Sequence, residues 1–285
     1  MPGQTAPRTA GLAISALLCF AANSILCRKA LGAHAIDAAS FTAVRIGAGA
    51  ITLAILLAAS GRWPARFPGR WAGAVALFAY AAAFSYAYVR IPAGVGALVL
   101  FGAVQLTMLG WAIRRGERPA PLEWVGFVVA AAGLVSLTLP GSSAPDLVGV
   151  GIMAAAGVAW GVYSLLGRGP VDPLAATAGN FLRAVPFAVA LALPARETLH
   201  ASTSGLVLAA VSGALASGVG YTIWYAALRG LTATRAAISQ LSVPALAAAA
   251  GIVLLGETLT LRVAVGGSVI LLGVGVAILG RARRI

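Results

Sequence analysis

Apolar segments long enough to cross a lipid bilayer recur along the whole 285-residue chain. A transmembrane helix needs about 20 predominantly apolar residues. Within lipid, a helix satisfies its own backbone hydrogen bonds, and loops rich in proline and glycine separate one helix from the next. We predict ten spans, at about residues 10–30, 36–59, 71–90, 92–114, 121–139, 147–167, 173–193, 204–228, 233–255 and 261–280. The predicted fold class is therefore an all-α membrane protein with ten transmembrane helices.

The charge pattern favours a membrane protein over a protein that binds nucleic acid. Charged residues make up 9% of the chain and the net charge is +13, whereas soluble domains carry about 25% charged residues. The basic residues lie at the ends of the apolar segments, without a basic-aromatic patch for nucleic acid. Most lie on the side that holds both termini, which predicts cytoplasmic termini and a multi-pass protein of the inner (plasma) membrane. The first apolar segment lacks a convincing cleavage site and is predicted to be a retained span.

A glycine-glutamate pair followed by two glycines at fixed spacing occurs twice, offset by 140 residues. The first copy is Gly116, Glu117, Gly126 and Gly133, and the second is Gly256, Glu257, Gly266 and Gly273. The duplication predicts two repeats, residues 1–142 and 143–285, with five spans each. An odd number of spans inverts the second repeat relative to the first, as in many transporters that open a central site alternately to the two sides.

Several of these residues carry a family resemblance. They are the two Gly-Glu motifs, the Trp160-Gly161 pair that opens the second repeat, and Arg45 and Arg183 in the second helix of each repeat. With them the chain resembles the ten-helix EamA-type branch of the drug/metabolite transporter superfamily, and within it the aromatic amino-acid exporters of the YddG type. The first span departs from the pattern, with Phe20-Ala21 where a Trp-Gly pair is usual. The resemblance implies export of amino acids, aromatic and other hydrophobic ones, and of related metabolites by alternating access.

All seven carboxylates are predicted at helix ends or in links, at Asp37, Glu117, Glu123, Asp146, Asp172, Glu197 and Glu257. An acidic residue inside the membrane is costly and usually functional, as in proton-driven pumps for cationic cargo. Their predicted positions favour neutral or zwitterionic cargo moved without a buried proton-coupling carboxylate. Glu117 and Glu257 are each predicted to cap the last helix of their repeat and to complement its dipole.

Aromatic residues away from the span ends are the main candidates for contacts with cargo. Tyr80, Phe84 and Tyr88 follow one another at four-residue intervals on one helix face. Aromatic walls with a few polar groups are typical of small-molecule pockets, although helix packing accounts equally well for any single residue and the amides also serve as interhelical glue. The candidate substrate-binding residues are Asn23, Ser24, Tyr80, Phe84, Tyr88, Phe101, Gln105, Trp160, Tyr163, Tyr221, Trp224 and Gln240.

Four further residues stand out inside the spans. Arg45 and Arg183 either meet a substrate carboxylate or bond to backbone carbonyls, and their duplicated placement favours a scaffold role. Pro186 and Pro244 interrupt the seventh and ninth spans, and we predict bends for gating there.

Other functional classes have little support in the sequence. The two histidines, His34 and His200, lie in predicted links, and the chain has no metal-ligand cluster and no P-loop. We therefore expect no metal, no cofactor, no enzymatic activity, and a monomer or weak oligomer. Efflux of a drug, purine or sugar derivative, possible coupling to protons, and a non-transporting membrane scaffold remain the alternatives.

Overall fold

The computed structural model describes residues 6–114, 121–138, 145–167, 172–193, 199–231, 239–240 and 242–282. The regular structure in these ranges is helical, apart from an isolated bridge between Ile36 and Ala201. The helices are α1 (Ala6–Gly32), α2 (Ala38–Ala59), α3 (Trp71–Tyr88), α4 (Ala93–Arg114), α5 (Pro121–Thr138), α6 (Leu147–Leu166), α7 (Pro173–Ala192), α8 (Thr203–Val211), η1 (Ser212–Val219), α9 (Gly220–Leu228), α11 (Ser242–Leu255) and α12 (Leu261–Ala282). Gly116 and Glu117 lie outside the described residues.

The helices lie where the hydropathy predicts them, to within a few residues wherever both ends are described. Six are long and apolar enough to cross a membrane: Pro7–Gly32, Ala38–Ala59, Trp71–Tyr88, Leu147–Leu166, Pro173–Ala192 and Thr203–Leu228. Shorter apolar helices cover Ala93–Met108, Trp124–Gly133, Ser242–Leu255 and Leu261–Gly273. Many large apolar side chains remain exposed, among them Ile51, Val128 and Leu272. Such an exterior suits lipid, which replaces water around membrane helices.

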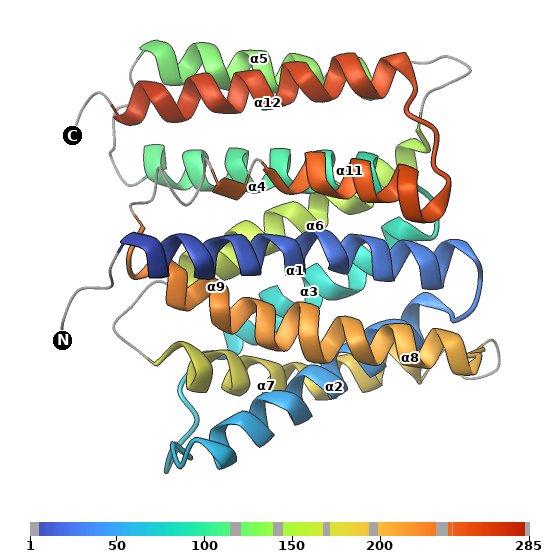
Figure 1. The fold of residues 1–285 in the computed structure, drawn as a ribbon, viewed down its shortest axis with the longest axis vertical. Helices are drawn as coiled ribbons and strands as arrows, with labels where there is room; N and C mark the ends of the chain where they lie inside the picture. The colour runs from blue at the N-terminus through green and yellow to red at the C-terminus, as the bar shows by residue number, and fades with distance from the viewer. Residues whose placement is uncertain are drawn as a thin grey trace.

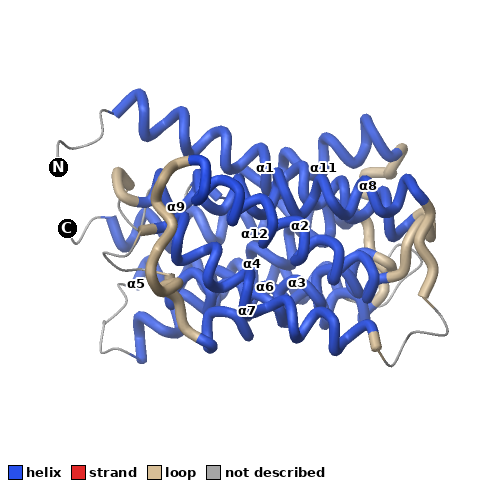
Figure 2. Tube along the Cα trace, turned by 90° about the horizontal axis from the view of Figure 1, so that it is seen from below, coloured by secondary structure: helices blue, strands red, loops and turns tan. Residues whose placement is uncertain are grey.

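The helices form one bundle with their axes along a common direction (Figure 1). The loops gather at its two ends (Figure 2). The start of α1 and the end of α12 lie at the same end (Figure 1). α1, α3, α6 and α9 run through the middle, and the α5–α12 pair forms one edge. Each of these four helices buries part of its side chains inside the protein, among them Phe20, Tyr80, Trp160 and Tyr221.

The glycines of the duplicated motif pack α5 against α12. A Cβ atom on Gly133 would lie 2.8 Å from the backbone nitrogen of Ile270, and one on Gly273 would overlap the backbone nitrogen of Ala130. Small residues let membrane helices approach closely and gain van der Waals contact. One glycine from each copy of the motif therefore serves the same helix crossing, which accounts for both positions without a role in chemistry.

The predicted span over residues 204–228 is one helical rod with an unpredicted π-helix, η1, between α8 and α9. Gly213 of η1 lies directly against α2, because a Cβ there would overlap the backbone carbonyl oxygen of Arg45. π-helical turns are rare and frequently occur at functional sites. Here the π-helix carries Ser212 and Ser217, which contact the interior of the bundle.

Asp37 joins the loop after α1 to the loop before α8. Its carboxylate accepts hydrogen bonds from the backbone N–H of Ser40 (2.8 Å), which caps α2, and from the N–H of His200 (3.0 Å). Partial burial opposes ionisation, but the hydrogen bonds from Ser40, His200 and Ala39 prevail and lower the pKa of Asp37. The carboxylate therefore stabilises this end of the bundle in its ionised form.

Replacing Asp37 with alanine should reduce the free energy of unfolding by about 1 kcal/mol at neutral pH, as for other helix caps. Because the folded-state pKa is depressed, this contribution is fully present above the unfolded value of about 3.9 and is lost as the pH falls through the folded pKa. Thermal unfolding of both proteins in detergent across this range is the measurement. An unchanged difference at the acid end would contradict the assignment.

Candidate functional site

A small cavity inside the bundle brings together residues from five helices. It measures about 10 Å³ and is lined by Phe20, Asn23, Ser24, Tyr80, Phe84, Leu100, Phe101, Trp160 and Tyr221. These residues belong to α1, α3, α4, α6 and α9, and therefore to both predicted repeats. A space of this size holds about one water molecule. The centre is closed in this conformation, and a larger occupant requires the side chains to separate.

Aromatic rings form most of the cavity wall. The ring of Trp160 lies 4.8 Å from that of Tyr80 and 4.7 Å from that of Tyr221, between ring centroids. Phe20 meets Trp160, Tyr221 and Trp224 edge to face at 5.9, 5.9 and 5.7 Å. Aromatic pairs favour tilted and edge-to-face contacts at such separations. The rings form a continuous apolar cluster that fills the closed centre.

Arg45 of α2 forms the polar side of this cluster, with 1% of its surface exposed. Its Nε donates to the Ser217 hydroxyl at 3.0 Å, and its Nη2 donates to the hydroxyls of Tyr221 (2.9 Å) and Tyr80 (3.2 Å). The guanidinium carbon also lies 5.0 Å from the ring centroid of Phe84. η1 presents Ser217 toward Arg45, and Tyr221 follows one turn later. The guanidinium is thus fixed by residues of α3, η1 and α9.

Asn23 extends the polar layer to α1. Its side-chain oxygen accepts a hydrogen bond from Ser212 at 2.6 Å, and its amide nitrogen donates to the Tyr80 hydroxyl at 3.4 Å.

The sequence patterns did not identify Ser212 or Ser217, because an α-helical reading of residues 204–228 gives their small side chains no special position. Phe20, also absent from the candidates, was detectable as the counterpart of Trp160 at the 140-residue offset.

The structure brings together seven of the candidate substrate-binding residues around the cavity: Asn23, Ser24, Tyr80, Phe84, Phe101, Trp160 and Tyr221. The other five, Tyr88, Gln105, Tyr163, Trp224 and Gln240, do not line it. Tyr88 packs against Phe84 at 4.6 Å, and Tyr163 packs on Trp160 at 5.5 Å. Tyr88, Tyr163 and Trp224 therefore support the cavity wall from behind.

Arg183, grouped with Arg45 by the repeat, has different surroundings. Its guanidinium donates to the backbone carbonyl oxygens of Phe67 (3.0 Å), Pro68 (3.2 Å) and Gly179 (2.9 Å). These contacts hold the connection between α2 and α3 against α7. The two arginines occupy comparable places in the sequence, but Arg183 bonds to the backbone whereas Arg45 bonds to side chains at the centre.

Comparison with known proteins identifies the family of this chain. The EamA-like transporter family matches residues 8–139 and again 147–279. The chain belongs to the EamA-like transporter family. It is a multi-pass membrane protein, and the family's role is transport of small molecules.

Several relatives of this EamA-like protein are recognisable. An uncharacterized protein of Pseudomonas aeruginosa is 53% identical over 97% of this chain and 98% of its own length. The threonine/homoserine exporter RhtA of Salmonella typhimurium is 30% identical over 91% of this chain and 89% of its own length. A protein of known crystal structure has a TM-score of 0.69 at 21% identity, over 99% of both chains, which shows a shared fold.

Glu257 of this EamA-like chain caps a different helix from the one predicted from the sequence. Both carboxylate oxygens accept from the backbone N–H of Ala93, the first residue of α4, at 2.8 and 3.0 Å. Its expected role as the cap of its own following helix is wrong, since Thr260 receives the N–H of Val263 there at 3.3 Å. Gly256 adopts a positive φ of 66° at the end of α11, a conformation that glycine allows. That turn directs Glu257 toward α4 instead of α12.

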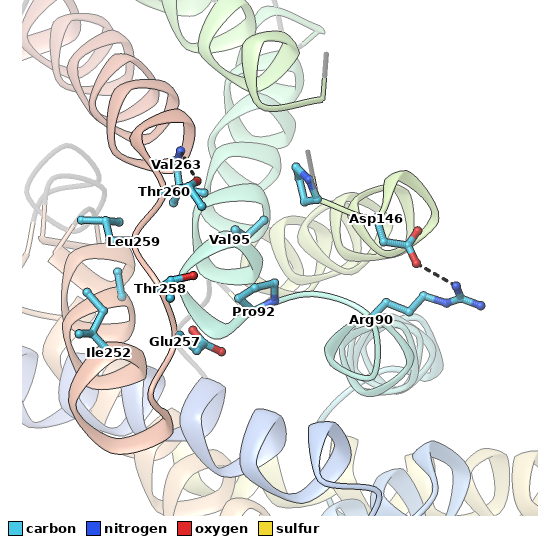
Figure 3. Close-up of a pocket in the computed structure, with 13 residues that line it drawn as sticks. Arg90, Pro92, Val95, Asp146, Ile252, Glu257, Thr258, Leu259, Thr260 and Val263 are labelled. Carbon is cyan, nitrogen blue, oxygen red and sulfur yellow. Dashed lines mark hydrogen bonds and ion pairs between the residues drawn. The ribbon is translucent and has the colours of Figure 1, made fainter. Parts of the chain in front are cut away.

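Glu257 also borders a second cavity, of about 290 Å³, at the end of the bundle opposite the termini. Glu257 lies beside Pro92, the residue before α4, on one side of this cavity. Arg90 and Asp146 lie on the opposite side (Figure 3). The Arg90–Asp146 ion pair of 2.9 Å keeps the pKa of Asp146 below its usual range. Exposed ion pairs contribute little to stability. The positions of Arg90 and Asp146 are therefore set mainly by the packing of the neighbouring helices α3, α4 and α6.

The carboxylates of the EamA-like chain lie away from the central cavity wherever their side chains are described. Asp37, Asp146 and Asp172 are the N-caps of α2, α6 and α7. Asp172 also pairs with Arg62, and Glu257 lies 3.5 Å from Arg28. All four therefore occupy helix ends or connections, as predicted.

Proposed function

We propose that this protein exports amino acids across the inner membrane by alternating access. Family membership and the named activity of the RhtA relatives support small-solute export as its role. The observation that carries the proposal is the composition of the cavity: aromatic rings and uncharged polar side chains from helices of both predicted repeats converge on one site. This lining suits a zwitterion with an apolar side chain. Aromatic and other hydrophobic amino acids are the first candidates, as the resemblance to the YddG type implies.

The transport cycle that we propose uses two inverted five-helix halves, residues 1–142 and 143–285, in a ten-helix bundle. Both termini would be cytoplasmic, a topology supported by the basic residues on that side and by the shared end of α1 and α12 in Figure 1. Rocking of one half against the other would open the closed cavity to each side in turn. Pro186 lies inside α7, where it removes a backbone hydrogen bond and favours a bend. Pro244 lies in α11, which is described from Ser242 onward, and we propose gating bends at both Pro186 and Pro244.

The energy source in this proposal is the cargo gradient, with no buried proton-coupling carboxylate. The described carboxylates at helix ends support this reading, because a proton carrier needs an ionisable group that changes exposure between the two sides. Two neutral tyrosine hydroxyls and Arg45 occupy the centre instead. An arginine side chain does not deprotonate in proteins, so Arg45 cannot deliver a proton.

The test is uptake of labelled phenylalanine, tryptophan, methionine, threonine and homoserine into proteoliposomes, with and without an imposed proton gradient. Empty liposomes are the control, and thermal unfolding of the reconstituted sample establishes that the protein is folded. We expect saturable uptake of at least one of these amino acids at a rate independent of the gradient. No uptake by folded protein would exclude this cargo class, and uptake only with the gradient would overturn the uncoupled mechanism.

A further inference from the structure

We propose that Arg45, together with the hydroxyls of Tyr80 and Tyr221, is the binding site for the carboxylate group of the cargo. The proposal rests on the proposed function for its choice of amino acids, but it makes a narrower claim about chemistry. It assigns to Arg45 a direct contact with cargo, and it requires an anionic group on every good substrate.

The first argument is the unbalanced charge of Arg45. Its side chain is buried to 1% exposure, and its hydrogen-bond partners Ser217, Tyr80 and Tyr221 are uncharged. Within the described part of the chain, the carboxylates lie at helix ends and none pairs with it. A charge inside a membrane bundle is costly unless an opposite charge or a full set of hydrogen bonds compensates it. A substrate carboxylate supplies that compensation.

The second argument is a surplus of hydrogen-bond donors. The Nη1 atom of Arg45 is buried and finds no partner among the described residues. The hydroxyls of Tyr80 and Tyr221 share one contact of 3.2 Å, and their other partners among the described residues, Arg45 and Asn23, are donors. Only one of the two hydroxyl protons can therefore be accepted within this group. Among the described residues, the N–H groups of Nη1 and one of the two tyrosine O–H groups therefore have no acceptor, and a carboxylate would provide one.

The third argument is position. Tyr80 and Tyr221 line the central cavity together with Phe20 and Trp160, and Arg45 lies behind the two tyrosine hydroxyls, outside the cavity lining. A carboxylate against Arg45 would leave the remainder of an amino acid among those rings once the cavity opens. Arginine holds carboxylates well because its planar guanidinium donates two parallel hydrogen bonds. Arg45 and Tyr80 belong to the first predicted repeat and Tyr221 to the second, so a bound carboxylate would also link the two halves.

Arg183 shows the alternative, a purely structural arginine. Its guanidinium donates three hydrogen bonds to backbone carbonyl oxygens, which are acceptors matched to its donors. No buried nitrogen of Arg183 is without a partner among the described residues. The contrast makes Arg183 the matched control for Arg45, since both are intramembrane arginines in corresponding helices.

The experiment measures equilibrium binding of labelled L-phenylalanine and L-threonine to purified protein in detergent. The competitors are phenylalaninol and threoninol, which lack the carboxylate, and 3-phenylpropionate, which lacks the amino group. In the wild type, we expect the amino alcohols to compete at least about tenfold more weakly than the parent amino acids, the scale of a lost charge-assisted hydrogen bond. 3-Phenylpropionate should still compete with phenylalanine.

Arg45→Gln should weaken binding by about tenfold or more and remove the preference for the carboxylate. Arg45→Lys should retain part of that preference, and Arg183→Gln should keep it in full even if it unfolds at a lower temperature. Thermal unfolding establishes that each variant is folded. Equal competition by the amino alcohols in the wild type, or an unchanged preference in folded Arg45→Gln, would overturn the proposal.

Failure of the two proposals can be told apart. If the wild type neither binds nor transports any of the five amino acids, the proposed function fails. The anion site is then tested alone by the shift in unfolding temperature that 3-phenylpropionate produces. A shift in the wild type that Arg45→Gln lacks would support the site, and no shift in either protein would overturn it.

Discussion

Replacing Trp160 with alanine is expected to lower the free energy of unfolding by about 3–5 kcal/mol, the usual cost of deleting a large buried aromatic side chain. Trp160 is 3% exposed and contacts Phe20, Tyr80, Tyr163 and Tyr221. Its removal leaves a void next to a cavity of only about 10 Å³, and the helices that meet there cannot fill that void by small movements. Thermal and denaturant unfolding in detergent measure the loss.

The matched control is Trp71→Ala. Trp71 is 59% exposed at the start of α3, where an amphipathic ring suits the membrane interface, so its removal should cost much less. Indole should restore part of the stability of Trp160→Ala by occupying the void, as apolar cavities bind small apolar ligands. Equal losses for the two variants would contradict the central role of the aromatic cluster.

Adding a single methyl group at Gly213 should destabilise the protein by about 1–3 kcal/mol, the range seen for overpacked interiors. A Cβ there would overlap the carbonyl oxygen of Arg45 and lie 2.8 Å from its carbonyl carbon. Backbone atoms of α2 cannot rotate away as a side chain can. η1 must therefore move from α2, and that movement separates Ser217 from Arg45.

Gly47→Ala on the same α2 helix is the control, because a Cβ on Gly47 meets nothing within 4 Å. Alanine is a better helix former than glycine by roughly 1 kcal/mol, so this variant should be neutral or slightly more stable. The two glycine-to-alanine changes thus have opposite expected signs, and unfolding temperatures compare them directly. A neutral Gly213→Ala would show that α2 and η1 are not in close contact.

Arg45 and Arg183 occupy comparable positions in the two predicted repeats but have different contacts. Duplicated placement favoured one scaffold role for both, and Arg183 has the contacts of such a role. Arg45 differs because its neighbours are set by α3, η1 and α9, which are distant in sequence. The Gly-Glu pair gives the same lesson: Gly256 turns the chain as a glycine should, but Glu257 caps α4, 164 residues away in sequence. A local motif identifies a carboxylate near a helix end without identifying the helix that it reaches.

The sequence by itself determined where the described helices of this protein lie along the chain. Hydropathy, proline and glycine act over a few neighbouring residues, so the ends of α2, α3 and α6 agree with the predicted spans to within a few positions. The same local signals placed the described carboxylates at helix ends and most of the cavity's aromatic rings inside.

Tertiary structure alone decided the chemistry of the centre. The π-helix η1, the contact of Ser217 with Arg45, and the unused donor on the guanidinium arise only when α2, α3 and α9 pack together. The physical reason is that hydrogen-bond satisfaction depends on partners from other helices, whereas helix formation in lipid depends on each segment's own backbone and hydropathy.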